Sequence, residues 1–143
     1  MKTKAIIIDI DGTICENVTG RPWYGKGAAE GMLEDKPYEN IINLISAYSY
    51  VYKLDVLILT GRHQGKELDA TKEWLKKNSF FYDAIFARDN RDFSKTAIYK
   101  EKVYEEQIKP FWDVVMVFED SNSCVQMFRN KGLTVLQPQN SDY

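Results

Sequence analysis

Five short apolar runs, separated by longer segments of mixed polarity, dominate the pattern of hydrophobic and polar positions along the chain. The first run, Ala5-Ile6-Ile7-Ile8, consists mainly of β-branched residues without polar alternation, which is typical of a strand buried on both faces. The other runs are of similar length. We predict strands at residues 5–8, 56–59, 83–87, 114–118 and 133–136.

Apolar residues recur at helical spacing between these runs and predict helices within residues 37–48, 68–79, 98–110 and 121–132. Pro37 can occupy the first turn of the first helix, and Gly132 can end the last one. Strands that alternate with helices imply right-handed crossovers and a parallel sheet covered on both faces. We therefore predict one α/β domain over residues 1–143.

One long stretch, residues 16–36, interrupts this alternation. It contains four glycines together with Pro22, Trp23 and Tyr24. A long irregular segment in a compact domain is usually functional, so we predict an active-site loop, with a poorly ordered insertion as the alternative. Trp23 and Tyr24 could stack on a base, or they could pin the loop to the domain.

Composition narrows the classes of function. The formal net charge of -2 argues against a protein that coats nucleic acid by bulk charge, although a local basic patch would not show in this sum. No apolar run approaches the ~20 residues of a membrane span, and the N-terminus does not resemble a signal peptide. Cys15 and Cys124 are isolated, so we expect a reducing cytoplasm, either of the cell or of an infected host cell.

Unusual polar residues follow three of the predicted strands. The first strand leads into residues 9–13, the second into 60–63 and the fourth into 119–122. The carboxyl ends of parallel strands form the edge of the sheet where ligands bind. These three segments therefore predict a polar site at that edge.

The residue types in these segments suggest phosphoryl transfer through an aspartate. Asp9 and Asp11 lean the same way on an extended chain, so their carboxylates repel unless a cation lies between them or one takes a proton. Glu119 and Asp120 could complete the ligands of Mg2+. One carboxylate can attack phosphorus while a neighbouring carboxyl group protonates the leaving oxygen and later activates water. Thr60 and a lysine can hold the phosphoryl oxygens.

Each segment also has a purely structural interpretation when taken alone. Asp-x-Asp-Gly occurs in turns and calcium loops, Thr60-Gly61-Arg62 could be a turn, and Glu119-Asp120 could start a helix favourably. An EF-hand would need further oxygen ligands that the residues after Asp11 do not provide. Three such segments at the ends of three strands, in this order, favour a site over coincidence.

These motifs resemble those of the haloacid dehalogenase (HAD) superfamily of phosphohydrolases. The matching segments are residues 9–13, 57–62 and 117–120, with a lysine on the helix before the fourth strand. A closer resemblance is to the phage-type polynucleotide kinase 3'-phosphatase domain, through residues 19–24, 60–65 and 88–92 and the spacing from Lys100 to Glu119. The resemblance implies a HAD-like Rossmannoid three-layer sandwich with a mainly parallel five-stranded sheet and a minimal cap.

The resemblance also implies roles for single residues. Asp9 would be the nucleophile and Asp11 the general acid/base, while Thr60 and Lys100 would bind the phosphoryl group. The implied substrate-binding residues are Arg21, Gly61 and Arg62. The implied magnesium site is formed by Asp9, the carbonyl of Asp11 and Asp120, with Glu119 bound to the ion either directly or through its other ligands. Lys95 is an alternative to Lys100. Two departures from the relative's pattern are Thr96, which stands in place of an aspartate, and the Glu-Asp pair at 119–120 in place of Asp-Asp.

The implied activity is a Mg2+-dependent phosphomonoesterase that forms an aspartyl-phosphate. The expected partner is a phosphorylated nucleic-acid end or a nucleotide, most specifically a 3'-phosphate. The alternatives are a phosphatase for small metabolites or 5'-nucleotides and a non-catalytic phosphate-binding module. No Gly-x-x-x-x-Gly-Lys-Ser/Thr motif occurs, so we expect no kinase activity from these residues.

Overall fold

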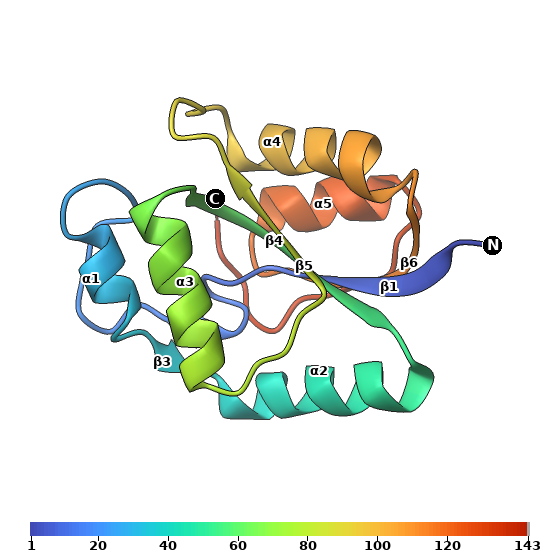
Figure 1. Cartoon of the computed structure of the whole chain (residues 1–143). Helices are drawn as coiled ribbons and strands as arrows, with labels where there is room; N and C mark the ends of the chain where they lie inside the picture. The colour runs from blue at the N-terminus through green and yellow to red at the C-terminus, as the bar shows by residue number, and fades with distance from the viewer. Residues whose placement is uncertain (143) are drawn as a thin grey trace.

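A five-stranded sheet forms the centre of the protein in a computed structural model that describes residues 1–142 (Figure 1). The strand order is β5-β4-β1-β6-β7, and every neighbouring pair is parallel. The strands are β1 (Thr3–Ile8), β4 (Asp55–His63), β5 (Ala84–Arg88), β6 (Trp112–Phe118) and β7 (Val135–Leu136). The predicted α/β fold with its parallel five-stranded sheet is therefore confirmed.

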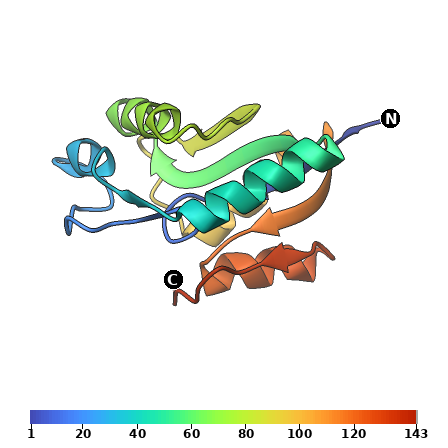
Figure 2. The same cartoon turned by 90° about the horizontal axis from the view of Figure 1, so that it is seen from below.

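Helices cover both faces of the sheet and form the two outer layers (Figure 1). They are α2 (Glu39–Tyr52), α3 (Lys66–Lys77), α4 (Thr96–Val103) and α5 (Asn122–Asn130). Helices α2 and α3 pack on one face, and α4 and α5 pack on the other. Figure 2 shows α2 running across its face of the sheet.

Alternation along β1 explains how one strand supports both layers. Ile6 and Ile8 belong to the core beneath α2 and α3, whereas Ile7 belongs to the core beneath α4 and α5. Successive side chains of a strand point to opposite faces, so a strand covered on both sides is apolar at every position. Because β1 lies between β4 and β6, its carboxyl end is the middle of the ligand-binding edge.

The helix predicted within residues 98–110 changes character along its length. It is α-helical over α4 and continues as the π-helical turn η1 (Tyr104–Ile108), closed by the Lys109 N–H, which donates to the Tyr104 carbonyl over 2.8 Å. Tyr104 and Ile108 both remain buried. Wider turns of this kind occur as short insertions in α-helices, and apolar spacing alone does not distinguish them.

The stretch expected to be irregular contains a short helix, α1 (Ala28–Met32), and its ends pair as the antiparallel strands β2 (Cys15–Glu16) and β3 (Lys36–Pro37). Ala28 and Met32 lie four residues apart and are buried together against Ala70 of α3. The sequence did not predict this helix, because a single apolar pair at one-turn spacing among several glycines is a weak helical signal. The segment is therefore a structured extension that packs on α3 rather than a loop without elements of its own.

Within residues 1–142, no helix has both the length and the apolar character needed to cross a membrane.

Trp74 of α3 fastens this extension to the domain. Its ring is buried in the core, and its Nε1–H donates to the Asp35 carbonyl over 2.8 Å. We expect Trp74→Ala to lower the free energy of unfolding by about 3–5 kcal/mol, because a large cavity replaces the ring. Trp74→Phe should cost less, because most of the volume stays filled. Urea unfolding measures both, and equal losses for the two variants would contradict this account.

Candidate active site

The order β4-β1-β6 brings the three polar segments together at one edge of the sheet. Asp9 and Asp11 follow β1, and Glu119 and Asp120 follow β6. The sequence predicted that the Thr60–His63 segment follows its strand. In the structure this segment instead forms the end of β4, where the pairing with β5 is irregular between Leu59 and His63. All three segments therefore reach the site from neighbouring strands.

Lys100 joins the carboxylates of two of these segments. Its Nζ lies 2.6 Å from Asp9 Oδ1 and 2.6 Å from Glu119 Oε2, and all three side chains are buried. Lys100 belongs to α4, which packs on one face of the sheet. Lys95, the other candidate lysine, is exposed at the start of α4. The structure thus brings Lys100 into the site and leaves Lys95 outside it.

The turn after Asp11 places a hydroxyl between two carboxylates. Thr13 Oγ1 lies 3.0 Å from Asp9 Oδ2 and 3.2 Å from Asp120 Oδ1. Gly12 adopts a φ of 81° in this turn, and a Cβ at this position would collide with the Asp120 carboxylate. A glycine is therefore required both by the backbone conformation and by the close approach of Asp120.

Negative charge is in excess around Asp9. Burial, together with the Glu119 and Asp120 carboxylates, holds the pKa of Asp9 well above its usual range despite the opposing effect of Lys100. Burial also raises the pKa of Glu119. Ligand oxygens of Asp9, Glu119 and Asp120 lie within 4.8 Å of one another. An all-oxygen donor set with too little positive charge fits a hard divalent cation.

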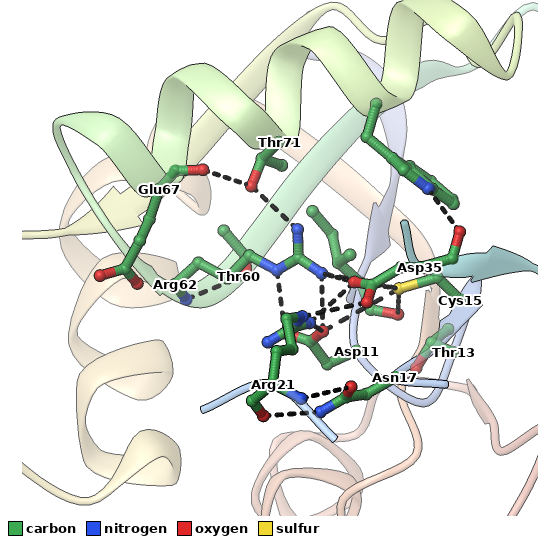
Figure 3. A network of polar contacts seen from close by, with 12 residues as sticks. Asp11, Thr13, Cys15, Asn17, Arg21, Asp35, Thr60, Arg62, Glu67 and Thr71 are labelled. Carbon is green, nitrogen blue, oxygen red and sulfur yellow. Dashed lines mark hydrogen bonds and ion pairs between the residues drawn. The ribbon is translucent and has the colours of Figure 1, made fainter. Parts of the chain in front are cut away.

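A second cluster surrounds Asp11 and is balanced in charge (Figure 3). Arg62 donates to Asp11 through Nε over 3.0 Å and through Nη2 over 2.7 Å. Arg21 Nη2 donates to the same carboxylate over 2.8 Å. These guanidinium groups outweigh the effect of burial and lower the pKa of Asp11. Asp11 is therefore ionised here, and the stability that its ion pairs contribute is lost as the pH falls through this lowered pKa.

Asp35 completes the second cluster and was not identified from the sequence. Its buried carboxylate accepts from Arg21 Nε over 3.0 Å, from Arg21 Nη2 over 2.7 Å and from Arg62 Nη2 over 2.8 Å. Two arginines thus share two aspartates. Asp11 and Asp35 also lie near the Cys15 thiol, but the arginines already neutralise this group, so it offers a cation less than the Asp9 cluster does.

Further contacts fix the direction of Arg62. Its Nη1 donates to Thr71 Oγ1 over 3.0 Å, and this hydroxyl donates to the Glu67 carbonyl over 2.7 Å (Figure 3). Its backbone N–H donates to Thr60 Oγ1 over 3.1 Å. Thr60, expected to hold the phosphoryl group, therefore contacts the Arg62 backbone in this structure.

A cavity of ≈ 480 Å³ opens over both clusters. Among its lining residues are the predicted site residues Asp9, Asp11, Gly61, Arg62, Lys100 and Glu119. Arg21, predicted to bind substrate, is not part of this lining, and its side chain is 2% exposed. It contacts Asp11 and Asp35, so its position is that of a residue that holds the acid/base candidate in place.

The sheet and the helices that cover it form a HAD-like α/β fold. A haloacid dehalogenase-like family hydrolase from Streptococcus pneumoniae has the same fold, with a TM-score of 0.63 and 17% identity over 94% of this chain and 84% of its own. A predicted phosphatase from Clostridium acetobutylicum gives a TM-score of 0.61 and 15% identity over 99% of this chain and 94% of its own.

The chain belongs to the family described as the polynucleotide kinase PNKP phosphatase domain, which its sequence matches over residues 3–143. Two chains from structures of the Pnkp1/Rnl/Hen1 complex, one described as an RNA repair complex, superpose with TM-scores of 0.87 and 25% identity. These similarities cover 99% of this chain but 44% and 48% of those chains. The chain thus spans less than half of their length.

Asp35 offers a test of the charge balance in the second cluster. We expect Asp35→Asn to lower the free energy of unfolding by about 3–5 kcal/mol, because it leaves buried guanidinium groups with one carboxylate instead of two. Urea unfolding of Asp35→Asn and of Asp113→Asn, which changes an exposed aspartate, checks this expectation. An equal and small effect in both variants would show that the cluster does not depend on Asp35.

Proposed function

We propose that the chain is a Mg2+-dependent phosphomonoesterase that acts through an aspartyl-phosphate on 3'-phosphate ends of polynucleotides or nucleotides. The observation that carries this proposal is the Asp9 carboxylate, which faces the cavity with Lys100 on one oxygen and Thr13 on the other. Membership of the polynucleotide kinase PNKP phosphatase domain family supports the class of substrate. The isolated cysteines are the basis for proposing a cytoplasmic location.

The proposed reaction has two displacements at phosphorus. In the first, an Asp9 oxygen attacks phosphorus, the bond to the ester oxygen breaks, and Asp11 gives that oxygen its proton. In the second, a water molecule attacks phosphorus and passes a proton to Asp11 while the bond to Asp9 breaks. The products are the alcohol and inorganic phosphate, and both side chains return to their starting forms.

In the proposed mechanism, substrate binding favours protonation of Asp11. Without substrate, Arg62 and Arg21 keep Asp11 ionised. A phosphate dianion in the cavity competes with Asp11 for the Arg62 guanidinium, which lines the cavity. Each hydrogen bond that Arg62 transfers from Asp11 to the phosphate raises the pKa of Asp11 and favours its protonation. The acid form is therefore produced where a phosphate is already bound.

Asp9, Glu119 and Asp120, with the Asp11 carbonyl as the remaining candidate ligand, would hold Mg2+. When bound, the ion supplies positive charge that keeps Asp9 ionised and stabilises the developing charge on the phosphoryl oxygens. Lys100 contributes a second, permanent positive charge to the same oxygens. Because the pKa of Asp9 is raised, added positive charge favours its ionised, nucleophilic form.

Direct comparison of substrates tests the proposed function. In Mg2+, we expect the chain to hydrolyse a 3'-phosphorylated oligonucleotide with a higher kcat/KM than a 3'-nucleotide, a 5'-nucleotide or a small sugar phosphate. Asp9→Asn should remove turnover by at least about a thousandfold, because an amide does not act as the nucleophile, whereas Asp113→Asn should not. A preference for the 5'-nucleotide or the sugar phosphate would support the alternative phosphatases, and no turnover of any substrate would support a phosphate-binding module.

Metal binding has a readout that does not require activity. We expect Mg2+ added to the EDTA-treated protein to raise Tm by several degrees, because binding to the folded state alone stabilises it. The shift should be smaller in Asp120→Asn, which removes one negative charge from the ligand set, and unchanged in Asp113→Asn. A wild-type Tm that does not respond to Mg2+ would contradict the proposed site.

A further inference from the structure

Three aromatic rings from separate segments meet at the rim of the active-site cavity. Tyr24 comes from the segment between β2 and α1, His63 from the end of β4 and Phe93 from the loop before α4. Their centroids are 5.6 Å apart for Tyr24 and Phe93, 5.9 Å for Tyr24 and His63, and 5.2 Å for His63 and Phe93. We call these three residues the aromatic cluster. All three line the cavity that contains Asp9 and Lys100.

Much of the aromatic cluster is open to solvent. Tyr24 is 58% exposed and Phe93 is 65% exposed. Single exposed apolar residues are ordinary, but rings gathered beside a charged cavity form a surface suited to a ligand. Trp23 differs from its neighbour Tyr24, because its ring packs against the Arg21 guanidinium at 5.4 Å. Trp23 also lines the cavity, but its ring is paired with a cation, whereas Tyr24 and Phe93 contact each other and His63 and are largely exposed.

Polar contacts behind the rings hold the aromatic cluster in place. His63 Nε2 lies 3.0 Å from the Asp92 carbonyl, next to Phe93 in the chain. The Glu67 carboxylate accepts from the Gly25 N–H over 3.2 Å, next to Tyr24. Arg88 Nη1 donates to the Ser94 carbonyl over 2.8 Å on the other side of Phe93. Rings that are already positioned lose less freedom when a ligand binds.

We propose that the aromatic cluster stacks on the terminal base of a polynucleotide whose 3'-phosphate faces Asp9, an inference that rests on the proposed function. The cavity combines charged groups suited to a phosphate with a wall of rings suited to a flat heterocycle. A nucleotide contains both a phosphate and a flat heterocyclic base, joined through one sugar. Stacking on aromatic rings tolerates any base because every base has a π face, so little base preference is expected.

A second cavity could accommodate the nucleotide that precedes the terminal one. The aromatic cluster lines this cavity too, and its volume is ≈ 480 Å³. Lys26 and Lys66 also line it and are balanced by Glu30 and Glu67, so it offers space rather than a strong positive field. A polynucleotide end can extend from the aromatic cluster into this space, which a mononucleotide leaves empty.

A pair of substrates that differ only in the terminal base tests this inference. One is a 3'-phosphorylated oligonucleotide with an ordinary last nucleoside, and the other ends in an abasic 3'-phosphate. We expect the wild type to have a KM roughly 5- to 100-fold lower for the substrate with the base, as expected for stacking on aromatic rings. Tyr24→Ala and Phe93→Ala should each bring this KM ratio several-fold closer to one.

Matched variants separate stacking from other effects. Tyr24→Phe keeps the π face and should keep the ratio, and Phe81→Ala, which removes an exposed ring outside the cavity lining, should leave it at the wild-type value. Equal KM values for the two substrates in the wild type would overturn the inference and leave the 3'-phosphatase proposal standing. Similar KM increases for both substrates in Tyr24→Ala would also overturn it. No hydrolysis of either substrate would overturn both proposals.

Discussion

Carboxylates crowd the carboxyl edge of the sheet, and the surrounding elements are arranged so that positive charge reaches them. Ionised groups removed from water are tolerated when partners of opposite charge lie against them. Helix α4 supplies Lys100 to Asp9 and Glu119. The end of β4 and the extension that contains α1 supply Arg62 and Arg21 to Asp11. The packing of these elements on the domain therefore also determines the electrostatics of the site.

The two clusters at this edge differ in their balance of charge. This difference shifts the pKa values of Asp9 and Asp11, two carboxyl groups of one short motif, in opposite directions. Asp11 shares two guanidinium groups with Asp35, which lowers its pKa although burial acts in the opposite direction. Asp9 shares the Lys100 ammonium with Glu119 and lies close to Asp120, so its pKa is raised. Residues two apart in the sequence thus have opposite tendencies to hold a proton. Of these two clusters, the one around Asp9 has more carboxylates than cationic side chains.

The sequence allowed the sheet and the centre of the site to be predicted because both have local signals. Apolar runs indicate buried strands, and the polar segments that follow them lie at one edge in any parallel sheet. Asp35 has no such signal, because its partners Arg21 and Arg62 are 14 and 27 residues away. The position of Arg21 against two aspartates also depends on how the extension folds back. A short helix among glycines, with two buried apolar residues, was too weak a pattern to predict this fold.

The extension connects the charge network to the rim of the cavity. Asn17 Nδ2 donates to the Arg21 carbonyl over 2.9 Å, and the Asn17 side-chain oxygen accepts from the Arg21 N–H over 3.2 Å. Arg21 also forms an ion pair with Asp35, near the other end of the extension. Tyr24 therefore lies between two residues that are fixed by the same ion-pair network as Asp11. In the proposed mechanism, protonation of Asp11 leaves both guanidinium groups with Asp35 as their shared carboxylate. An incoming phosphate dianion then gives Arg62, which lines the cavity, a second anionic partner, so substrate binding and protonation of Asp11 favour each other.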